Sequence, residues 1–121
     1  MFIKARTGLL ATVLMLAVTF PASAGDVEKG KILFKKHCKS CHRLTEGVLL
    51  GPSLKGVTKR LSEEWLDKWL EDPKAVFESG DPYAVEIVGK YKKMMPKKAG
   101  MGKKENRDDV IMFLKANENS D

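Results

Sequence analysis

Two cysteines and a histidine stand within five residues of one another, in the run Cys38-Lys39-Ser40-Cys41-His42. Two residues between the thiols let one turn of chain present both sulfurs to a single group, and the adjoining imidazole can reach a metal beside them. Covalent attachment of a c-type haem requires this set, with the sulfurs on the two vinyl groups and the imidazole on iron. We therefore expect one haem c, attached through Cys38 and Cys41 and ligated by His42.

Other interpretations of this run fit less well. A redox pair of the thioredoxin type belongs to a βαβ unit, and the neighbouring sequence lacks that strand and helix alternation. A structural zinc site normally takes four thiolate or imidazole ligands, whereas the chain has two cysteines and two histidines, His37 and His42. A plain disulfide at this separation needs a special turn. Haem attachment is the interpretation that uses all three side chains.

The first 24 residues have the pattern of a secretory signal peptide. Lys4 and Arg6 give a positive start, residues 9–20 are apolar, and Ala22-Ser23-Ala24 is a small-residue cleavage site. The apolar run is shorter than the about 20 residues that span a bilayer, and no cysteine follows the cut to carry a lipid. We expect a signal peptide at 1–24 and a periplasmic domain at 25–121 with no stable membrane anchor; an uncleaved anchor is the alternative.

Cleavage would leave a single small domain with a modest positive charge. The formal net charge is +6 for the whole chain and falls to +4 when Lys4 and Arg6 leave with the signal peptide. Domains of this size bury a limited fraction of their surface unless another group joins the core. A haem would be such a group.

The mature chain reads as an all-α fold of about four short helices, because no segment sustains the alternation of a strand. Each expected helix has a capping residue or an apolar stripe. The four run from after Asp26 to about Cys38, from Ser62 to the stop at Asp72-Pro73, from Asp81-Pro82 through Tyr91, and from a start between Lys103 and Asn106 to about Ala116.

Three further segments resemble the class I cytochromes c over essentially the whole mature chain. Gly30 and Phe34 precede the first cysteine at the intervals of that family, residues 107–115 are similar to its last helix, and residues 51–56 are similar to its loop beneath the haem. The resemblance implies that the first and last helices cross at Gly30. It also implies that the carbonyl of Pro52 accepts a hydrogen bond from His42 and orients its ring.

The family takes its sixth iron ligand from a methionine in the loop before the last helix. Three methionines lie there, and Met95-Pro96 matches the Met-Pro pair often found at that place, so we select Met95. Met101 and Met94 remain alternatives. Met112 falls within the last helix and has a packing role there. Of the two tryptophans, Trp69 is our candidate for a hydrogen bond to a haem propionate, while Trp65 packs in the core.

Histidine and methionine on both faces of the iron leave no open position for a substrate and favour the reduced state. The expected function is one-electron transfer, without enzyme activity and without nucleic-acid binding. Two other classes stay open: a haem subunit of a periplasmic oxidoreductase, and a ligand-binding haem protein with an open distal position. Lysines crowd the distal loop, either as a solvated surface or as a positive ring that steers an acidic redox partner. They are Lys90, Lys92, Lys93, Lys97, Lys98, Lys103 and Lys104.

Overall fold

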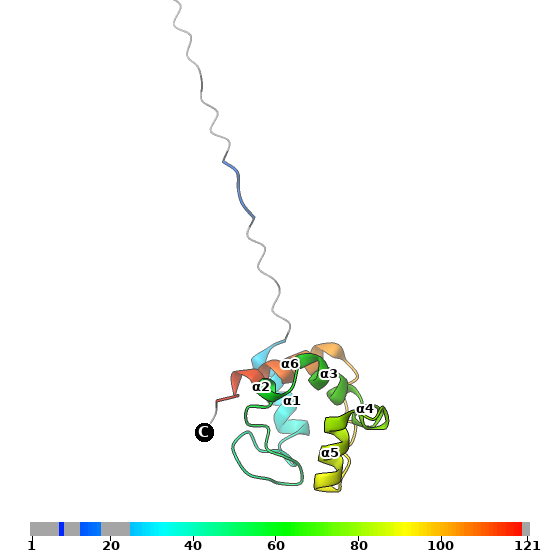
Figure 1. The fold of residues 1–121 in the computed structure, drawn as a ribbon. Helices are drawn as coiled ribbons and strands as arrows, with labels where there is room; N and C mark the ends of the chain where they lie inside the picture. Colours follow the sequence, from blue (N-terminus) through cyan, green and yellow to red (C-terminus); the bar gives the residue numbers. More distant parts are fainter. Residues whose placement is uncertain (1–7, 9–12, 18–24, 120–121) are drawn as a thin grey trace, which may run out of the picture.

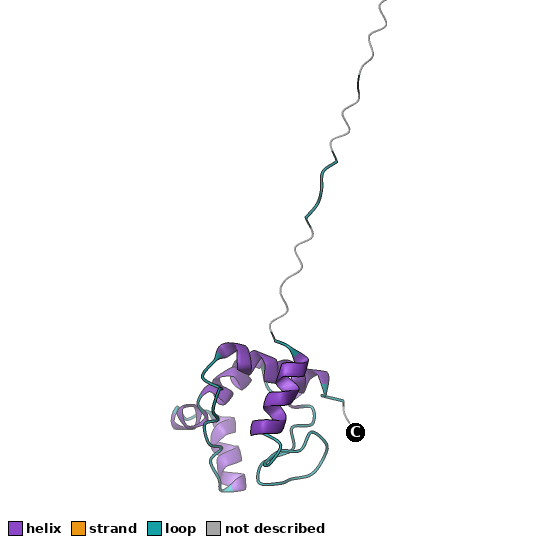
Figure 2. Ribbon diagram, turned by 180° about the vertical axis from the view of Figure 1, so that it is seen from behind, coloured by secondary structure: helices purple, strands orange, loops and turns teal. Residues whose placement is uncertain are grey.

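The computed structural model describes residues 8, 13–17 and 25–119. The expected cleavage site at Ala22-Ser23-Ala24 lies outside these residues. The described part contains helices and loops and no strand (Figures 1 and 2). The helices are α1 (Val27–His37), α2 (Val57–Arg60), α3 (Glu63–Glu71), α4 (Pro73–Glu78), α5 (Pro82–Tyr91) and α6 (Lys104–Ala116). The expected all-α fold is confirmed.

The first and last helices, α1 and α6, cross at Gly30. A Cβ built on this glycine would lie 2.0 Å from the backbone oxygen of Asp109, so only a residue without a side chain permits the approach. Beside the crossing, the rings of Phe34 and Phe113 pack with centroids 5.3 Å apart. This contact, between segments about 80 residues apart in the sequence, belongs to the hydrophobic core, and the close approach at Gly30 confirms the expected crossing.

Side-chain caps set the helix boundaries that the sequence predicted. Asp26 accepts a hydrogen bond from the backbone N–H of Lys29, and Ser62 accepts one from Trp65, each at 3.1 Å. The carboxylate of Asp81 does the same for α5, where Pro82 occupies the first turn. These bonds satisfy N–H groups that have no partner within the helix itself. α6 begins at Lys104, within the range left open by the sequence.

Two helices were not expected. α2 has four residues, too few to show a helical period, and α4 starts where we expected only a stop. Asp72 explains α4: it is the residue that ends α3, and its side chain then accepts a hydrogen bond from the N–H of Ala75. Pro73 fits the first position of a helix because its missing N–H would have no partner there. The fold therefore has six helices in the described residues instead of about four.

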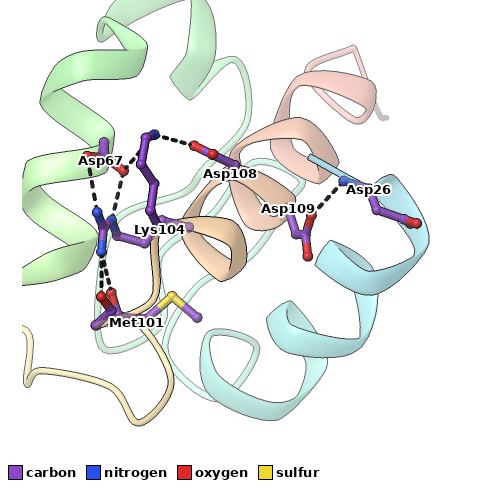
Figure 3. Close-up of polar contacts among 8 residues, drawn as sticks. Asp26, Asp67, Met101, Lys104, Asp108 and Asp109 are labelled. Atoms are coloured by element: carbon purple, nitrogen blue, oxygen red, sulfur yellow. Dashed lines mark hydrogen bonds and ion pairs between the residues drawn. The ribbon is translucent and has the colours of Figure 1, made fainter. Parts of the chain in front are cut away.

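A buried arginine joins α3, α6 and the loop between α5 and α6. The guanidinium of Arg107, 5% exposed, donates to Asp67 on α3 at 2.7 Å and to the carbonyls of Met101 and Gly102 at 3.0 and 3.1 Å. Lys104 adds an ion pair with Asp108 at 2.9 Å on the surface (Figure 3). The end of the loop is thereby fixed against the two helices.

Candidate functional site

The two cysteines and the histidine lie where α1 ends. The N–H of Cys38 still bonds to the carbonyl of Phe34, and the carbonyl of Cys38 then accepts the N–H groups of Cys41 and His42 at 3.1 and 3.0 Å. This tight turn puts both thiols and the imidazole on one cavity. Cys38 is buried, Cys41 is half-buried, and both are free thiols.

The imidazole of His42 is held by the loop that follows it. Its Nδ1 lies 2.8 Å from the carbonyl oxygen of Pro52, and because a carbonyl only accepts, Nδ1 carries the proton and Nε2 keeps its lone pair. Burial lowers the pKa of His42, against the raising effect of that carbonyl, and nearby Lys98 lowers it further. The neutral ring is the form that binds a metal.

Gly51 leaves room for this ring. A Cβ at Gly51 would come within 2.6 Å of Cε1 of His42, so a larger residue would displace the imidazole. The N–H of Gly51 bonds to the carbonyl of Cys41 at 2.9 Å, which ties the loop to the turn that carries the thiols. The expected hydrogen bond between His42 and Pro52 is therefore present, and a glycine cradle accompanies it.

The cavity is an apolar pocket whose walls come from most of the fold. The turn after α1 and the loop 50–54 contribute to it, as do α3, α5, α6 and the loop after α5. In Figure 1 the loop that follows α1 lies to one side of that helix and α5 to the other. The apolar and aromatic side chains that face it include Leu54, Val57, Trp65, Leu66, Trp69, Tyr83, Ile87, Tyr91, Val110 and Leu114. Such a lining suits a flat hydrophobic group.

The contribution of α5 was the part of the cavity that sequence reasoning undervalued. Tyr83, Ile87 and Tyr91 are spaced by four and share one helix face, but no role at the site was predicted for them from the sequence. All three line the cavity. Their spacing was the signal, since a helix face that is apolar must be covered by something.

The chemistry of the thiols argues against the alternatives to haem attachment. Burial raises the pKa of Cys38 to about 11, with a smaller opposing effect from Lys98 and a small raising effect from Cys41. A catalytic redox thiol needs a lowered pKa, because the thiolate is the nucleophile. Among the described residues, no cluster of three or more His, Cys, Asp or Glu side chains could hold a metal ion. The raised pKa of Cys38 disfavours a thiolate of the thioredoxin type, and the described residues form no zinc site.

The three candidate methionines of the distal loop are not equivalent. Met94 and Met95 both line the cavity, whereas Met101 is 1% exposed and packs in the protein core, away from the cavity lining. The loop starts at Lys92, whose left-handed backbone ends α5 and turns the chain back. The geometry favours the pair Met94 and Met95 over Met101.

The two tryptophans stack on α3 and both line the cavity. Their ring centroids are 5.1 Å apart with an interplanar angle of 15°. The indole N–H of Trp69 donates to Sδ of Met95 at 3.1 Å. The indole nitrogen of Trp65 is buried and has no hydrogen-bond partner among the described residues. An unpartnered buried donor is costly, so this N–H indicates that an acceptor belongs in the cavity.

The residues present fit a haem with two thioether bonds. Two thiols, an imidazole with a free lone pair and a thioether-bearing methionine line one apolar cavity, and so does Trp65, whose buried N–H has no partner among the described residues. Soft sulfur and imidazole donors are the axial ligands that haem iron takes in c-type cytochromes. No contact in this structure tests the predicted bond from Trp69 to a propionate, and the single N–H of Trp69 donates to Met95 here.

Comparisons with known proteins agree with this site. Residues 27–118 match the family model for cytochrome c. Cytochrome c2 of Rhodobacter capsulatus is 33% identical over 108 residues, which are 82% of this chain and 75% of the relative. Cytochrome c of Chlamydomonas reinhardtii is 32% identical over 102 residues, 78% of this chain and 91% of the relative.

Solved structures give the same answer. A cytochrome c from Rhodothermus marinus superposes with a TM-score of 0.71 and 26% identity, over 78% of each chain. The family model covers the described domain from α1 to just beyond α6, including the turn with both thiols. The chain belongs to the cytochrome c family.

Proposed function

We propose that this protein is an exported monohaem cytochrome c that carries single electrons, with haem c bound through Cys38 and Cys41 and with His42 and Met95 as the axial ligands. Family membership supports the covalently bound haem. When bound, the haem iron supplies the one-electron chemistry. The polypeptide binds the group, keeps water from it and sets its ligands.

One observation carries the proposal: the cavity brings together both thiols, the free Nε2 side of His42 and the sulfur of Met95. His42 is fixed by Pro52 and Met95 by Trp69, so both ligands have a second partner that orients them. With both axial positions filled by protein groups, no position is left for a substrate. This arrangement supports electron transfer over ligand binding or catalysis.

The free indole N–H of Trp65 is our candidate for a hydrogen bond to a haem propionate. Its ring lines the cavity, its nitrogen is buried without a partner among the described residues, and a carboxylate would satisfy it. The structure favours Trp65 over Trp69, the candidate predicted from the sequence, because the N–H of Trp69 donates to Met95.

The test of the proposal is an optical spectrum of the purified ferric protein, with variants at the candidate methionines. We expect the weak near-infrared band of sulfur bound to ferric iron, lost in Met95→Ala and retained in Met94→Ala. Met94 is the matched control because it is adjacent and lines the same cavity. Rapid carbon monoxide binding by the reduced native protein, or a band that survives in Met95→Ala, would contradict the ligand assignment.

We also propose export, with cleavage of the signal peptide after Ala24. The segment 1–24 has the charge and apolar pattern of a signal peptide, and one relative is a bacterial cytochrome c2. No helix in the described part of the chain is long and apolar enough to cross a membrane. Intact-mass analysis of the periplasmic fraction should give a chain starting at Gly25 plus one haem. A mass that still includes residues 1–24 would contradict it.

The redox partner is proposed to have an acidic docking surface. Lys93 and Lys98 line the cavity itself, whereas Lys104 is paired with Asp108 on α6 and is less available. Positive charge beside the site of electron exit would speed association with an acidic partner at low salt. Electron-transfer rates should fall as ionic strength rises, and more in the native protein than in Lys93→Gln. Rates independent of salt would remove this part of the proposal.

A further inference from the structure

Asp109 is a buried acid that has no cation beside it in the described part of the chain. It is 8% exposed and lies within α6, where its Oδ1 accepts the backbone N–H of Asp26 at 2.6 Å (Figure 3). Arg107, which is also buried, has Asp67 as its counter-ion at 2.7 Å, whereas no ion pair among the described residues includes Asp109. A buried carboxylate with one neutral donor is costly, because a charge taken out of water needs an opposite charge as well as hydrogen bonds.

Gly25 is held directly beside this carboxylate. Its φ is +98°, and a Cβ there would come within 2.5 Å of both the backbone oxygen of Asp108 and Cγ of Met112, so only glycine fits. The backbone nitrogens of successive residues are at most about 3.7 Å apart. Because the nitrogen of Asp26 lies 2.6 Å from Oδ1 of Asp109, the nitrogen of Gly25 lies within about 6 Å of the same oxygen.

The charge of the Gly25 nitrogen depends on processing. In the precursor this nitrogen belongs to the peptide bond with Ala24 and is neutral. Hydrolysis of that bond leaves a carboxylate on Ala24, which departs with the signal peptide, and an amine on Gly25. An α-amino group has an ordinary pKa of about 8, so it is mostly protonated at neutral pH. The proposed cleavage therefore puts one positive charge next to a buried acid that has none.

We propose that the α-ammonium of Gly25 is the counter-ion of Asp109, so that removal of the signal peptide completes the crossing of α1 and α6. This rests on the export part of the proposed function. The N-terminal end of α1 already favours a nearby acid with the equivalent of about half a charge, and the ammonium adds a whole charge beside it. The precursor lacks that charge, so the crossing reaches its full stability only after export.

Two other carboxylates lie near Gly25, and both suit an ammonium less well. Asp108 already pairs with Lys104 at 2.9 Å. Asp26 is exposed to water, and its carboxylate accepts the backbone N–H of Lys29. Asp109 alone among these three acids combines burial with the lack of a cation in the described chain. Substitution by asparagine distinguishes the three acids, because it keeps an acceptor oxygen and removes the charge.

The test moves the amine without changing the net charge of the chain. Insertion of Gly-Ser-Gly-Ser between Ala24 and Gly25 keeps the residues before the cut and puts the new N-terminus four residues away. In denaturant unfolding of the holoprotein, we expect the insertion to raise the unfolding equilibrium constant about tenfold, the effect of a partly buried ion pair. In an Asp109→Asn background the same insertion should change it by less than about twofold. Asp108→Asn and Asp26→Asn are the matched controls and should leave the tenfold effect intact.

A second readout uses the folded native chain and does not depend on the stability of Asp109→Asn. The reagent 2-pyridinecarboxaldehyde reacts selectively with α-amines. It should label the native protein several-fold more slowly than the chain with the insertion, because an ammonium paired with Asp109 must leave its partner before it reacts. Asp109→Asn should label faster than the native protein, and Asp108→Asn at the native rate.

The outcomes separate the ion pair from the processing on which it rests. An equal effect of the insertion with and without Asp109 overturns the proposal, and so does a coupling to Asp108 or Asp26 in its place. Equal labelling rates for the native chain and the chain with the insertion also overturn it. Intact mass is measured first, since a native chain that does not start at Gly25 contradicts the proposed cleavage, a failure distinct from the absence of the ion pair in a correctly processed chain.

Discussion

The crossing of α1 and α6 is tightly packed with protein atoms, whereas the wall of the cavity leaves its apolar side chains facing an open space. At the crossing, protein atoms fill the space so closely that Gly30 has no room for a methyl group. At the wall, α3 and α5 turn aromatic side chains toward a cavity, and the N–H of Trp65 has no partner in the described chain. The crossing needs no bound group to fill its packing, whereas the cavity wall buries its side chains fully only when a group is bound. We infer that the two regions depend on haem to very different degrees.

The largest expected effect comes from removing the attachment itself. Cys38→Ala/Cys41→Ala should yield a colourless chain, and the apolar wall would face water. A domain of this size has only about 5–15 kcal/mol of stability in total, so cooperative unfolding should be lost. Circular dichroism and hydrogen exchange would measure this, with protection vanishing first in α5. A double variant that keeps native protection in α5 without haem would contradict the comparison.

The next effect tests the crossing. Gly30→Ala places a Cβ against the backbone oxygen of Asp109, which cannot move aside as a flexible side chain could. We expect a loss of about 3 kcal/mol in denaturant unfolding of the holoprotein. Gly89→Ala is the matched control: Gly89 lies within α5 with nothing within 4 Å of the added carbon, and this change should stabilise by about 0.5–1 kcal/mol. Equal effects at the two glycines would show that the crossing is not tightly packed.

A third prediction concerns the ion pair that joins the two regions. Arg107→Met leaves Asp67 and two loop carbonyls without their donor, at a cost of about 2 kcal/mol. Because the same side chain fixes the end of the loop with Met95, the near-infrared band should also be lost at a lower temperature. Glu64→Gln, which breaks the exposed pair with Lys68, is the control and should change neither quantity.

The smallest effects compare two caps. Asp26→Ala and Asp81→Ala each remove one carboxylate that accepts a backbone N–H, from α1 and α5 respectively. Each should cost about 1 kcal/mol locally. In native hydrogen exchange, the loss at Asp26 should appear in α1 and α6 together, while the loss at Asp81 should be confined to α5. A global loss from Asp81→Ala would mean that α5 belongs to the same cooperative unit as the crossing.

Local chemistry made much of the fold predictable. Ser62, Asp26 and Asp81 cap helices at the places expected, because the side chain and the backbone N–H that donates to it are three residues apart. α2 and α4 were not predicted because they are shorter than two helical turns, and so short a segment shows no helical periodicity of apolar residues. The sequence identified Asp72 as the end of α3 but not as the N-cap of α4.

Some features of the candidate site could likewise be predicted from the sequence, and others could not. The hydrogen bond from His42 to Pro52 was implied by the resemblance of residues 51–56 to the loop of the cytochromes c, and it is present. The roles of the two tryptophans did not follow, because residues four apart share a helix face and only the position of Met95 distinguishes them. The pair Arg107 and Asp67, 40 residues apart, leaves no local pattern at all.

The stacked indoles on α3 also make this protein's tryptophan fluorescence an intrinsic probe of the cavity. They are the only two tryptophans of the chain, and both line the cavity. Energy transfer to an adjacent porphyrin would quench their fluorescence, so the native protein would show almost no tryptophan emission. An increase in tryptophan fluorescence would then report that α3 has moved away from the haem, and the measurement needs no added label.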